Sequence, residues 1–176
     1  SYADFEKTDP VEITQRSGQE LKVYYTRKSY TLSYQTNGGS YIEPQTGLYE
    51  EKLPITSDIP TKEGYTFAGW YTNKELTGSP VTGSIELTGD QRLYAKWEPK
   101  IVPYTVVYFK EVYDTSTRTI KYVYQTTAPK SGTVGTTVQA STADSIASSL
   151  PYHQTDTEKN ANSSVVIKPD GSSVLN

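Results

Sequence analysis

The single histidine is the first place to look for chemistry, because histidine is the usual general base beside a serine nucleophile. His153 follows Pro151-Tyr152, which resembles the start of a loop, and no nucleophile-elbow spacing accompanies it. A glycosidase would need two carboxylates facing each other across a cleft. The acidic candidates Glu50-Glu51, Asp90 and Glu111 fall on or beside expected turns and edges. We therefore expect solvated side chains, no catalytic residues and no enzymatic activity.

Two further segments contain residue types that bind ions. Asn37-Gly38-Gly39-Ser40 lacks the Gly-Lys-Ser/Thr ending of a phosphate loop and no predicted helix follows it, so we expect a turn. Residues 156–160 only approximate a calcium loop, which needs spaced Asp or Asn ligands ending in Glu. The chain contains no cysteine, which excludes disulfides, thiolate nucleophiles and Cys-based metal sites. We expect no bound metal and no cofactor.

Aromatic side chains are the remaining candidates for ligand binding, since exposed rings commonly stack on sugars. The structural alternative is that Tyr65, Phe67 and Trp70 pack under a sheet that Trp97 closes. Both interpretations remain open from the residues alone. The four candidate ligand-binding residues are Trp70, Tyr71, Tyr94 and Trp97.

The composition narrows the class of protein. Hydrophobic residues make up 34% of the 176 residues, which leaves little apolar material for one thick core. The 16 tyrosines suit thin sheets, where a ring is buried and its hydroxyl stays wet. A net charge of −3 argues against a nucleic-acid partner. No apolar run is long enough to insert into a membrane, and neither a signal pattern nor a sorting motif is visible, so we expect an internal piece of a longer chain.

Alternation of apolar and polar residues with period two predicts a mainly β fold, α+β at most. Turn-forming residues such as Lys62-Glu63-Gly64 and Pro169-Asp170-Gly171 bound the runs. One short helix is predicted at residues 141–150, just before Pro151. The predicted strands include residues 30–35, 65–72, 93–97, 104–109 and 120–124.

The organisation of the chain follows from one joint and one repeat. Residues 98–103 carry two prolines, which predicts a short, stiff joint outside any strand ladder. Residues 11–22 and 165–176 each read as strand, tight turn and strand, so the pattern repeats within the chain. Residues 1–26 therefore look like the closing strands of a preceding unit, and the partners expected first are neighbouring repeats of the same chain. The predicted domains are 1–26, 27–99 and 100–176.

The closing strands 11–14 and 21–25 cannot form a core alone. We expect them to pack on the following unit, or to fill the equivalent place in a neighbouring molecule.

Two families resemble this sequence. The blocks at residues 64–71, Gly-Tyr-Thr-Phe-Ala-Gly-Trp-Tyr, and 93–97, Leu-Tyr-Ala-Lys-Trp, make residues 30–97 similar to the Listeria–Bacteroides repeat of internalin B-type B repeats. Residues 103–176 resemble MucBP-like repeats more weakly, through Tyr-Thr-Val-Val-Tyr at 104–108 and the closing strand pair.

The resemblances imply tandem, small β-grasp-like modules in a bacterial cell-surface protein. They imply an extracellular location, with attachment to the cell wall through parts outside this sequence. The expected role is a non-enzymatic stalk or spacer in adhesion. The alternative is an adhesin module that binds a host surface protein or glycan through exposed aromatics or an unpaired strand edge.

Overall fold

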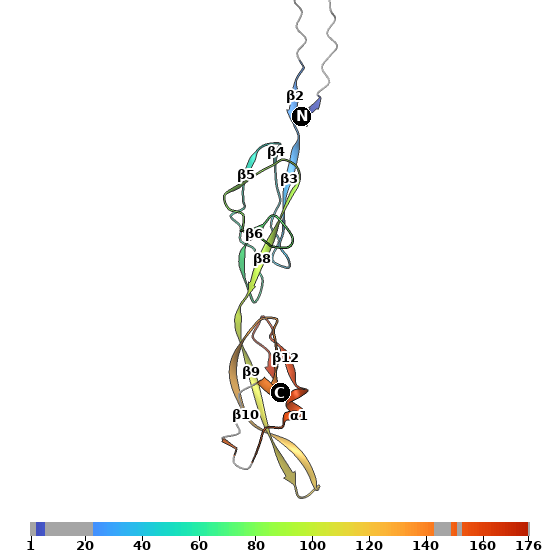
Figure 1. Ribbon diagram of the computed structural model, residues 1–176, viewed down its shortest axis with the longest axis vertical. Helices are drawn as coiled ribbons and strands as arrows, with labels where there is room; N and C mark the ends of the chain where they lie inside the picture. The colour runs from blue at the N-terminus through green and yellow to red at the C-terminus, as the bar shows by residue number, and fades with distance from the viewer. Residues whose placement is uncertain (1–2, 6–22, 143–148, 151–152, 176) are drawn as a thin grey trace, which may run out of the picture. The chain divides into compact units, whose positions relative to one another are not determined.

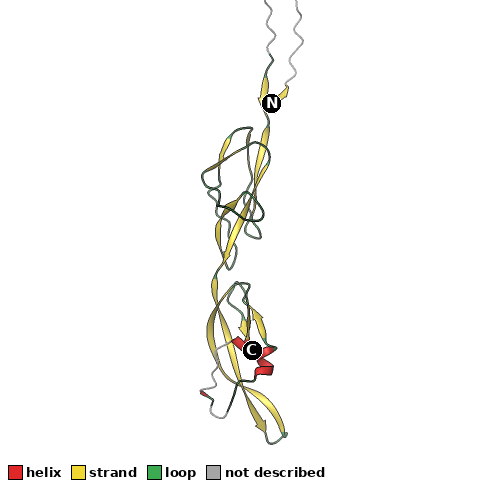
Figure 2. Ribbon diagram, viewed as in Figure 1, coloured by secondary structure: helices red, strands yellow, loops and turns green. Residues whose placement is uncertain are grey.

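The computed structural model describes residues 3–5, 23–142, 149–150 and 153–175 (Figure 1). The chain divides into two compact units. Unit 1 comprises residues 1–60 and 68–96, and unit 2 comprises residues 61–67 and 97–176. Strands dominate both units (Figure 2), so the predicted mainly β fold is confirmed. The β-grasp relationship stays a prediction.

Unit 1 is organised around a four-stranded sheet with strand order β4-β3-β8-β6. β3 runs antiparallel to β4 and parallel to β8. The pairing of β3 with β8 joins segments that are far apart in the sequence. Two smaller antiparallel pairs, β5-β7 and β1-β2, complete the described strands. The bounds are β1 Ala3–Phe5, β2 Tyr25–Arg27, β3 Ser29–Gln35, β4 Gln45–Leu48, β5 Lys52–Pro54, β6 Tyr65–Tyr71, β7 Ser84–Glu86 and β8 Gln91–Pro99.

The turn after β3 forms as its residue types predict. Asn37 and Gly38 both adopt positive φ, 50° and 86°, a region that asparagine and glycine tolerate best. The side-chain amide of Asn37 also donates a 2.7 Å hydrogen bond to the carbonyl of Ala95 in β8. The turn is thus tied to the parallel strand beside it.

The core of unit 1 gathers the inward-facing residues of these strands. Leu32 of β3 has no exposed surface, and Leu93 and Ala95 of β8 are equally enclosed. The alternation along each strand places these residues on one face, as period-two patterning requires. The buried apolar residues of unit 1 are Leu32, Ile42, Leu53, Trp70, Tyr71, Leu87, Leu93 and Ala95.

Unit 2 is built on one long antiparallel hairpin. β9 and β10 pair from Ile101↔Thr133 to Asp114↔Thr119, with a register shift between Tyr124 and Thr126. β13 lies on the other side of β9 and runs parallel to it, while β11 pairs with β12. The bounds are β9 Ile101–Asp114, β10 Thr119–Thr133, β11 Thr137–Gln139, a 3₁₀ turn at Ala140–Thr142, α1 Thr157–Ala161, β12 Ser164–Val166 and β13 Val174–Leu175.

The core of unit 2 is small. Tyr104 and Val106 of β9 pack with Ile167 and Leu175 from the closing segment. These four residues are buried, and partly buried side chains from β9, β11 and β12 surround them. The unit therefore depends on its last strand to close its interior.

The joint at residues 98–103 was predicted to lie outside any ladder, and this is wrong. Pro99 ends β8, Lys100 alone separates β8 from β9, and Pro103 lies inside β9 opposite Ser131. The N–H of Thr105 points away from β10, towards Ser173. Because backbone groups alternate sides along a strand, the ring nitrogen of Pro103 faces the same way, and the missing donor costs no bond to β10.

Helical structure differs from the prediction for residues 141–150. The 3₁₀ turn covers the start of that stretch, while residues 143–148 lie outside the described residues. The sequence did not predict α1, which begins after Asp156. The predicted strand 11–14, and the first two residues of strand 21–25, also lie outside the described residues.

Candidate binding surfaces

Two of the four candidate ligand-binding residues lie inside unit 1. Trp70 and Tyr71, at the end of β6, are only 4% and 5% exposed. The Trp70 ring packs at 57° against Tyr34, with 4.9 Å between ring centroids. Burial raises the pKa of Tyr34, whose hydroxyl accepts a hydrogen bond from the N–H of Thr56. These rings hold the sheet to its covering loop, so their aromatic surface is used in packing.

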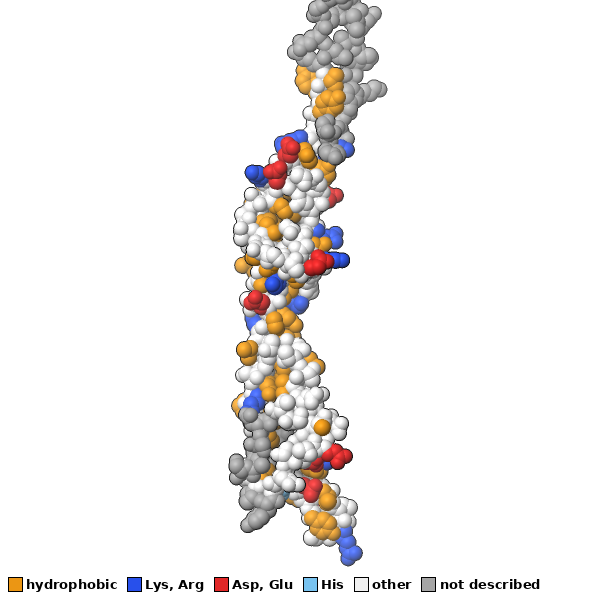
Figure 3. Space-filling model, viewed as in Figure 1, with side chains coloured by type: hydrophobic (Ala, Val, Ile, Leu, Met, Phe, Trp, Pro, Cys, Tyr) orange, Lys and Arg blue, Asp and Glu red, His pale blue; other side chains and the backbone are white. Residues whose placement is uncertain are grey.

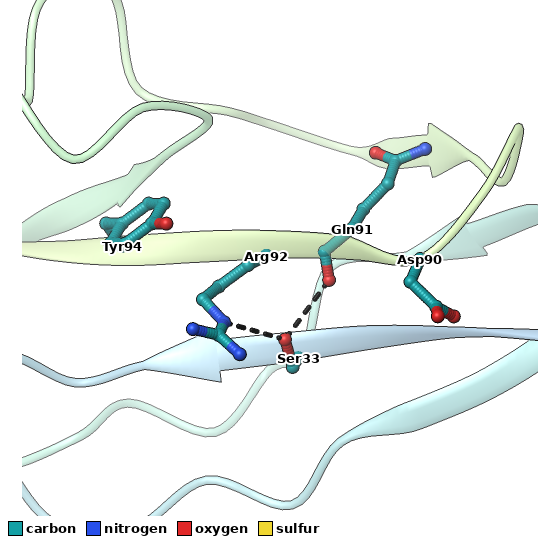
Figure 4. Close-up of a pocket in the computed structure, with 5 residues that line it drawn as sticks. All are labelled: Ser33, Asp90, Gln91, Arg92 and Tyr94. Carbon is teal, nitrogen blue, oxygen red and sulfur yellow. Dashed lines mark hydrogen bonds between the residues drawn. The ribbon is translucent and has the colours of Figure 1, made fainter.

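Tyr94 lies beside an open surface hollow of about 270 Å³ (Figure 4). The other lining residues are Ser33, Asp90, Gln91 and Arg92. Ser33 Oγ donates to the carbonyl of Gln91 at 3.2 Å and accepts from Arg92 Nε at 3.3 Å. The Ser33 hydroxyl therefore links the Arg92 side chain to the backbone of Gln91.

Trp97, near the end of β8, is half-buried. Its ring meets Phe67 nearly edge-on, with centroids 5.5 Å apart. The ammonium of Lys62 lies 5.8 Å from the Trp97 ring and 4.6 Å from the Tyr65 ring. The four predicted residues are therefore spread over β6 and β8 in different surroundings.

A group of exposed hydrophobic residues, three aromatic and one aliphatic, that the sequence did not single out lies on the β9–β10 hairpin. The register pairs Phe109 with Tyr124 and Tyr113 with Ile120, which puts all four side chains on one face. Phe109 and Tyr124 meet edge to face, with 6.5 Å between centroids. All four are at least 45% exposed, and hydrophobic side chains are visible along this hairpin in Figure 3. We call Phe109, Tyr113, Ile120 and Tyr124 the hairpin face.

Tyr122 lies on the same side of the hairpin, between Ile120 and Tyr124, and bonds to the start of α1. Its hydroxyl donates to Asp156 Oδ2 at 2.5 Å and lies 3.3 Å from Glu111 Oε2. The Lys159 ammonium lies 4.7 Å from the Tyr122 ring. The bond to Asp156 raises the pKa of Tyr122 to about 12, and the neighbouring carboxylates add to the rise.

Asp156, in the segment that approximates a calcium loop, is the N-cap of α1. Its side chain accepts a 3.0 Å hydrogen bond from the N–H of Lys159, the arrangement that begins an α-helix. This bond, followed by the one from Tyr122, lowers the pKa of Asp156. Among residues 3–5, 23–142, 149–150 and 153–175, no three acidic or histidine side chains form a metal-binding group.

The other residues considered for chemistry have structural contacts. His153 Nε2 lies 3.2 Å from the carbonyl of Glu111. Glu51 accepts from the N–H of Leu48, and Asp90 accepts from the N–H of Thr31. Each of these side chains thus bonds to a backbone group of a strand.

Comparison with known proteins identifies one part of the chain. Residues 30–96 match the Listeria-Bacteroides repeat domain family. A "Putative Gly-rich membrane protein" of Evansella cellulosilytica is 33% identical over 101 residues, which cover 55% of this chain and 12% of that protein. A "Putative membrane protein" of the same organism is 37% identical over 105 residues, covering 58% of this chain and 14% of that protein. The chain thus matches a small part of each relative.

Within the described part of the chain, no helix has the length and apolar character to cross a membrane.

Proposed function

Because residues 30–96 form a Listeria–Bacteroides repeat domain, we propose that this chain is a non-enzymatic repeat region of a bacterial cell-surface protein. Its role there is that of a stalk or spacer in adhesion, outside the cell and attached through other parts of the parent protein. The names of the two relatives, both putative membrane proteins, support a place at the cell envelope.

The observation that best supports the spacer role is the connection between β8 and β9, near residue 100. β8 and β9 are separated by Lys100 alone. The N–H of Lys100 donates to the carbonyl of Gly64 at 2.8 Å, and its carbonyl accepts from the N–H of Val134 at 3.0 Å. A connecting residue bonded at both its backbone groups suits a protein that transmits tension, because a long free loop would stretch first.

A length-series experiment tests the spacer role. One, two or four copies of this chain are placed between a cell-wall anchor and an unrelated binding domain, and capture of cells by immobilised ligand is measured under flow. Capture should rise with the number of copies. Substitution of the hairpin-face residues should leave capture unchanged. Saturable binding by the chain alone, without the added domain, would contradict a purely spacing role.

The hairpin face favours a second candidate, direct adhesion to a host protein or glycan. Exposed rings clustered on one face are a common device for binding sugars and proteins. Purified chain is tested on glycan arrays and on mucin-coated or matrix-coated surfaces, beside a Tyr124→Ala variant. Saturable binding that this variant loses, with folding retained, establishes the adhesin role; silence over the whole panel removes it.

A further inference from the structure

β3 and β8 are, in sequence order, the first and last strands of the four-stranded sheet of unit 1, and they are neighbours at its centre. The two strands run parallel, with four paired residues on each. The chain enters β3 from β2, which ends at Arg27, and it leaves along β8, which ends at Pro99. Tension along the chain therefore reaches this sheet at the start of β3 and at the end of β8.

The parallel direction decides how such tension acts on the pair. The start of β3 is pulled away from the end of β8, and in parallel strands these two points lie at opposite ends of the contact. The strands are thus pulled to slide past each other, which loads all their backbone hydrogen bonds together. Antiparallel neighbours pulled in the same way would separate from one end, one bond at a time. Sliding therefore requires the whole contact to break at once.

Side chains add bonds between the same two segments, beyond both ends of the four-residue pairing. Before it, Asp90 Oδ1 accepts a hydrogen bond from the N–H of Thr31 at 2.8 Å. After it, the side-chain amide of Asn37 donates to the carbonyl of Ala95 at 2.7 Å. These two bonds lengthen the contact that sliding must break.

Between these ends, Ser33 links β3 to two residues of β8 (Figure 4). Its hydroxyl donates to the carbonyl of Gln91 and accepts from Arg92 Nε. Both bonds cross from one strand to the other, so sliding disturbs them as well. The hollow that these residues line therefore lies over the contact between β3 and β8.

The core opposes sliding as well. Leu32 of β3 and Leu93 and Ala95 of β8 have at most 1% of their surface exposed. Pairing again with a shift of one residue would turn the inward side chains of a strand outward, because successive side chains point to opposite faces. Tyr34 of β3, whose ring packs on Trp70 of β6, would lose that contact. Sliding therefore exposes apolar surface in addition to breaking hydrogen bonds.

We propose that unit 1 is a mechanical clamp, a module in which the contact between residues 31–37 and residues 90–95 withstands tension along the chain. The use of such a clamp rests on the spacer role, because a spacer under flow must keep its length when it is pulled. The clamp itself is a property of the folded unit, so it is measurable whatever the parent protein does.

Single-molecule pulling between engineered cysteines tests the clamp, because the chain has no cysteine of its own. Ser29→Cys with Glu98→Cys places the handles at the start of β3 and near the end of β8, which loads the contact in shear. Ser29→Cys with Thr88→Cys places both handles at the same end of the strand pair, which peels it open. All three positions are exposed, and circular dichroism confirms that each variant is folded.

The two pulling directions give opposite expectations for one and the same fold. At equal pulling speed, the unfolding force should be at least about twofold higher in shear than in peeling, because the bonds then share the load. Equal forces in the two directions, or a higher force in peeling, would overturn the proposal.

A matched pair of glycine substitutions tests the side-chain bonds. Asn37→Gly removes the amide that bonds to Ala95, while glycine tolerates the positive φ of 50° at this position. Asn73→Gly is the control, since the Asn73 side chain bonds to Thr77 within a surface loop. In the shear arrangement, Asn37→Gly should lower the unfolding force and Asn73→Gly should not. Equal losses in the two variants would show that this contact does not bear the load.

The clamp and the spacer role fail separately. A low shear force, with capture of cells that still rises with the number of copies, would overturn the clamp and keep the spacer role. A high shear force, with capture that does not depend on the number of copies, would support the clamp and remove the spacer role.

Discussion

The hydroxyl of Tyr122 donates a 2.5 Å hydrogen bond to Asp156, 34 residues away in the sequence, and so joins β10 to the first residue before α1. Asp156 also accepts from the N–H of Lys159, so one carboxylate starts the helix and holds it against the hairpin. A five-residue helix is too short to be stable by itself. Its place in unit 2 thus depends on contacts such as this one.

The first prediction concerns the titration of Tyr122. Its pKa is raised to about 12 chiefly by the bond to Asp156. Asp156→Asn removes the negative acceptor, so the pKa should fall towards the usual value of 10.0. NMR titration of the Tyr122 ring carbon that bears the hydroxyl measures the change. Asp170→Asn, in the turn after β12, is the control and should leave this titration unaltered.

The same bond makes the stability of the folded chain depend on pH. The pKa of Tyr122 is higher in the folded chain than in the unfolded chain. Its contribution to the stability of the folded state is therefore complete below pH 10 and is lost as the pH rises through about 12. The pKa of Asp156 is lowered by folding, so its contribution is present above its usual value of 3.8 and is lost at lower pH. Wild-type chain should therefore resist base better than Asp156→Asn between pH 10 and 12, and equal base resistance would refute the coupling.

A second prediction concerns Gly69 in the middle of β6. Its φ of +119° is a conformation that L side chains rarely adopt, and an added Cβ would lie 2.8 Å from Pro80 Cβ. Gly69→Ala combines backbone strain with a clash, so we expect a loss of about 2–4 kcal/mol in the free energy of unfolding. Urea unfolding followed by circular dichroism measures it.

The control for Gly69 is Gly89, which has an ordinary φ and open space around its Cβ position. Gly89→Ala should change the free energy of unfolding by less than about 1 kcal/mol. Similar losses in the two variants would show that glycine content, rather than the Pro80 contact, sets the stability here.

The sequence predicted the elements that depend on local pattern. Strand 30–35 and the turn at Asn37 were found because alternation and turn chemistry are properties of neighbouring residues. Pro103 was misplaced because a proline in a strand is acceptable only when its nitrogen faces away from the paired strand, and sequence does not give that direction.

The binding surface was harder to predict than the fold. Trp70 and Tyr124 both lie in strands that alternation predicts, yet one is 4% exposed and the other 61%. The difference arises because β9 and β10 continue past the small core of unit 2. The residues of that core come together through pairing between distant parts of the chain, which local sequence does not reveal. The cap Asp156, followed by Glu158 in the first turn, was the one local signal that could have predicted α1.

A third prediction concerns Ser173, which is 2% exposed. Its Oγ accepts from the N–H of Lys168 at 2.8 Å and donates to the carbonyl of Val166 at 3.2 Å, which closes the turn between β12 and β13. Ser173→Ala leaves both backbone groups without that partner, so we expect a loss of about 1–3 kcal/mol.

Urea unfolding of Ser173→Ala is compared with Ser164→Ala, an exposed serine of β12. The latter should stay within about 0.5 kcal/mol of wild type. If Ser173→Ala were equally mild, water would be replacing the hydroxyl, and the turn would not depend on it.

The last prediction separates packing from binding among the aromatics. Trp70→Ala should cost about 3–5 kcal/mol, because the ring is buried against Tyr34 and its removal leaves a cavity. Tyr113→Ala, at 62% exposure on the hairpin face, should cost less than about 1 kcal/mol. Any loss of ligand binding in the Trp70 variant would therefore reflect a weakened unit 1, whereas loss in the Tyr113 variant would report on the surface. Urea unfolding of both variants decides it: a stability loss at Tyr113 as large as that at Trp70 would mean that the hairpin face is packed in solution.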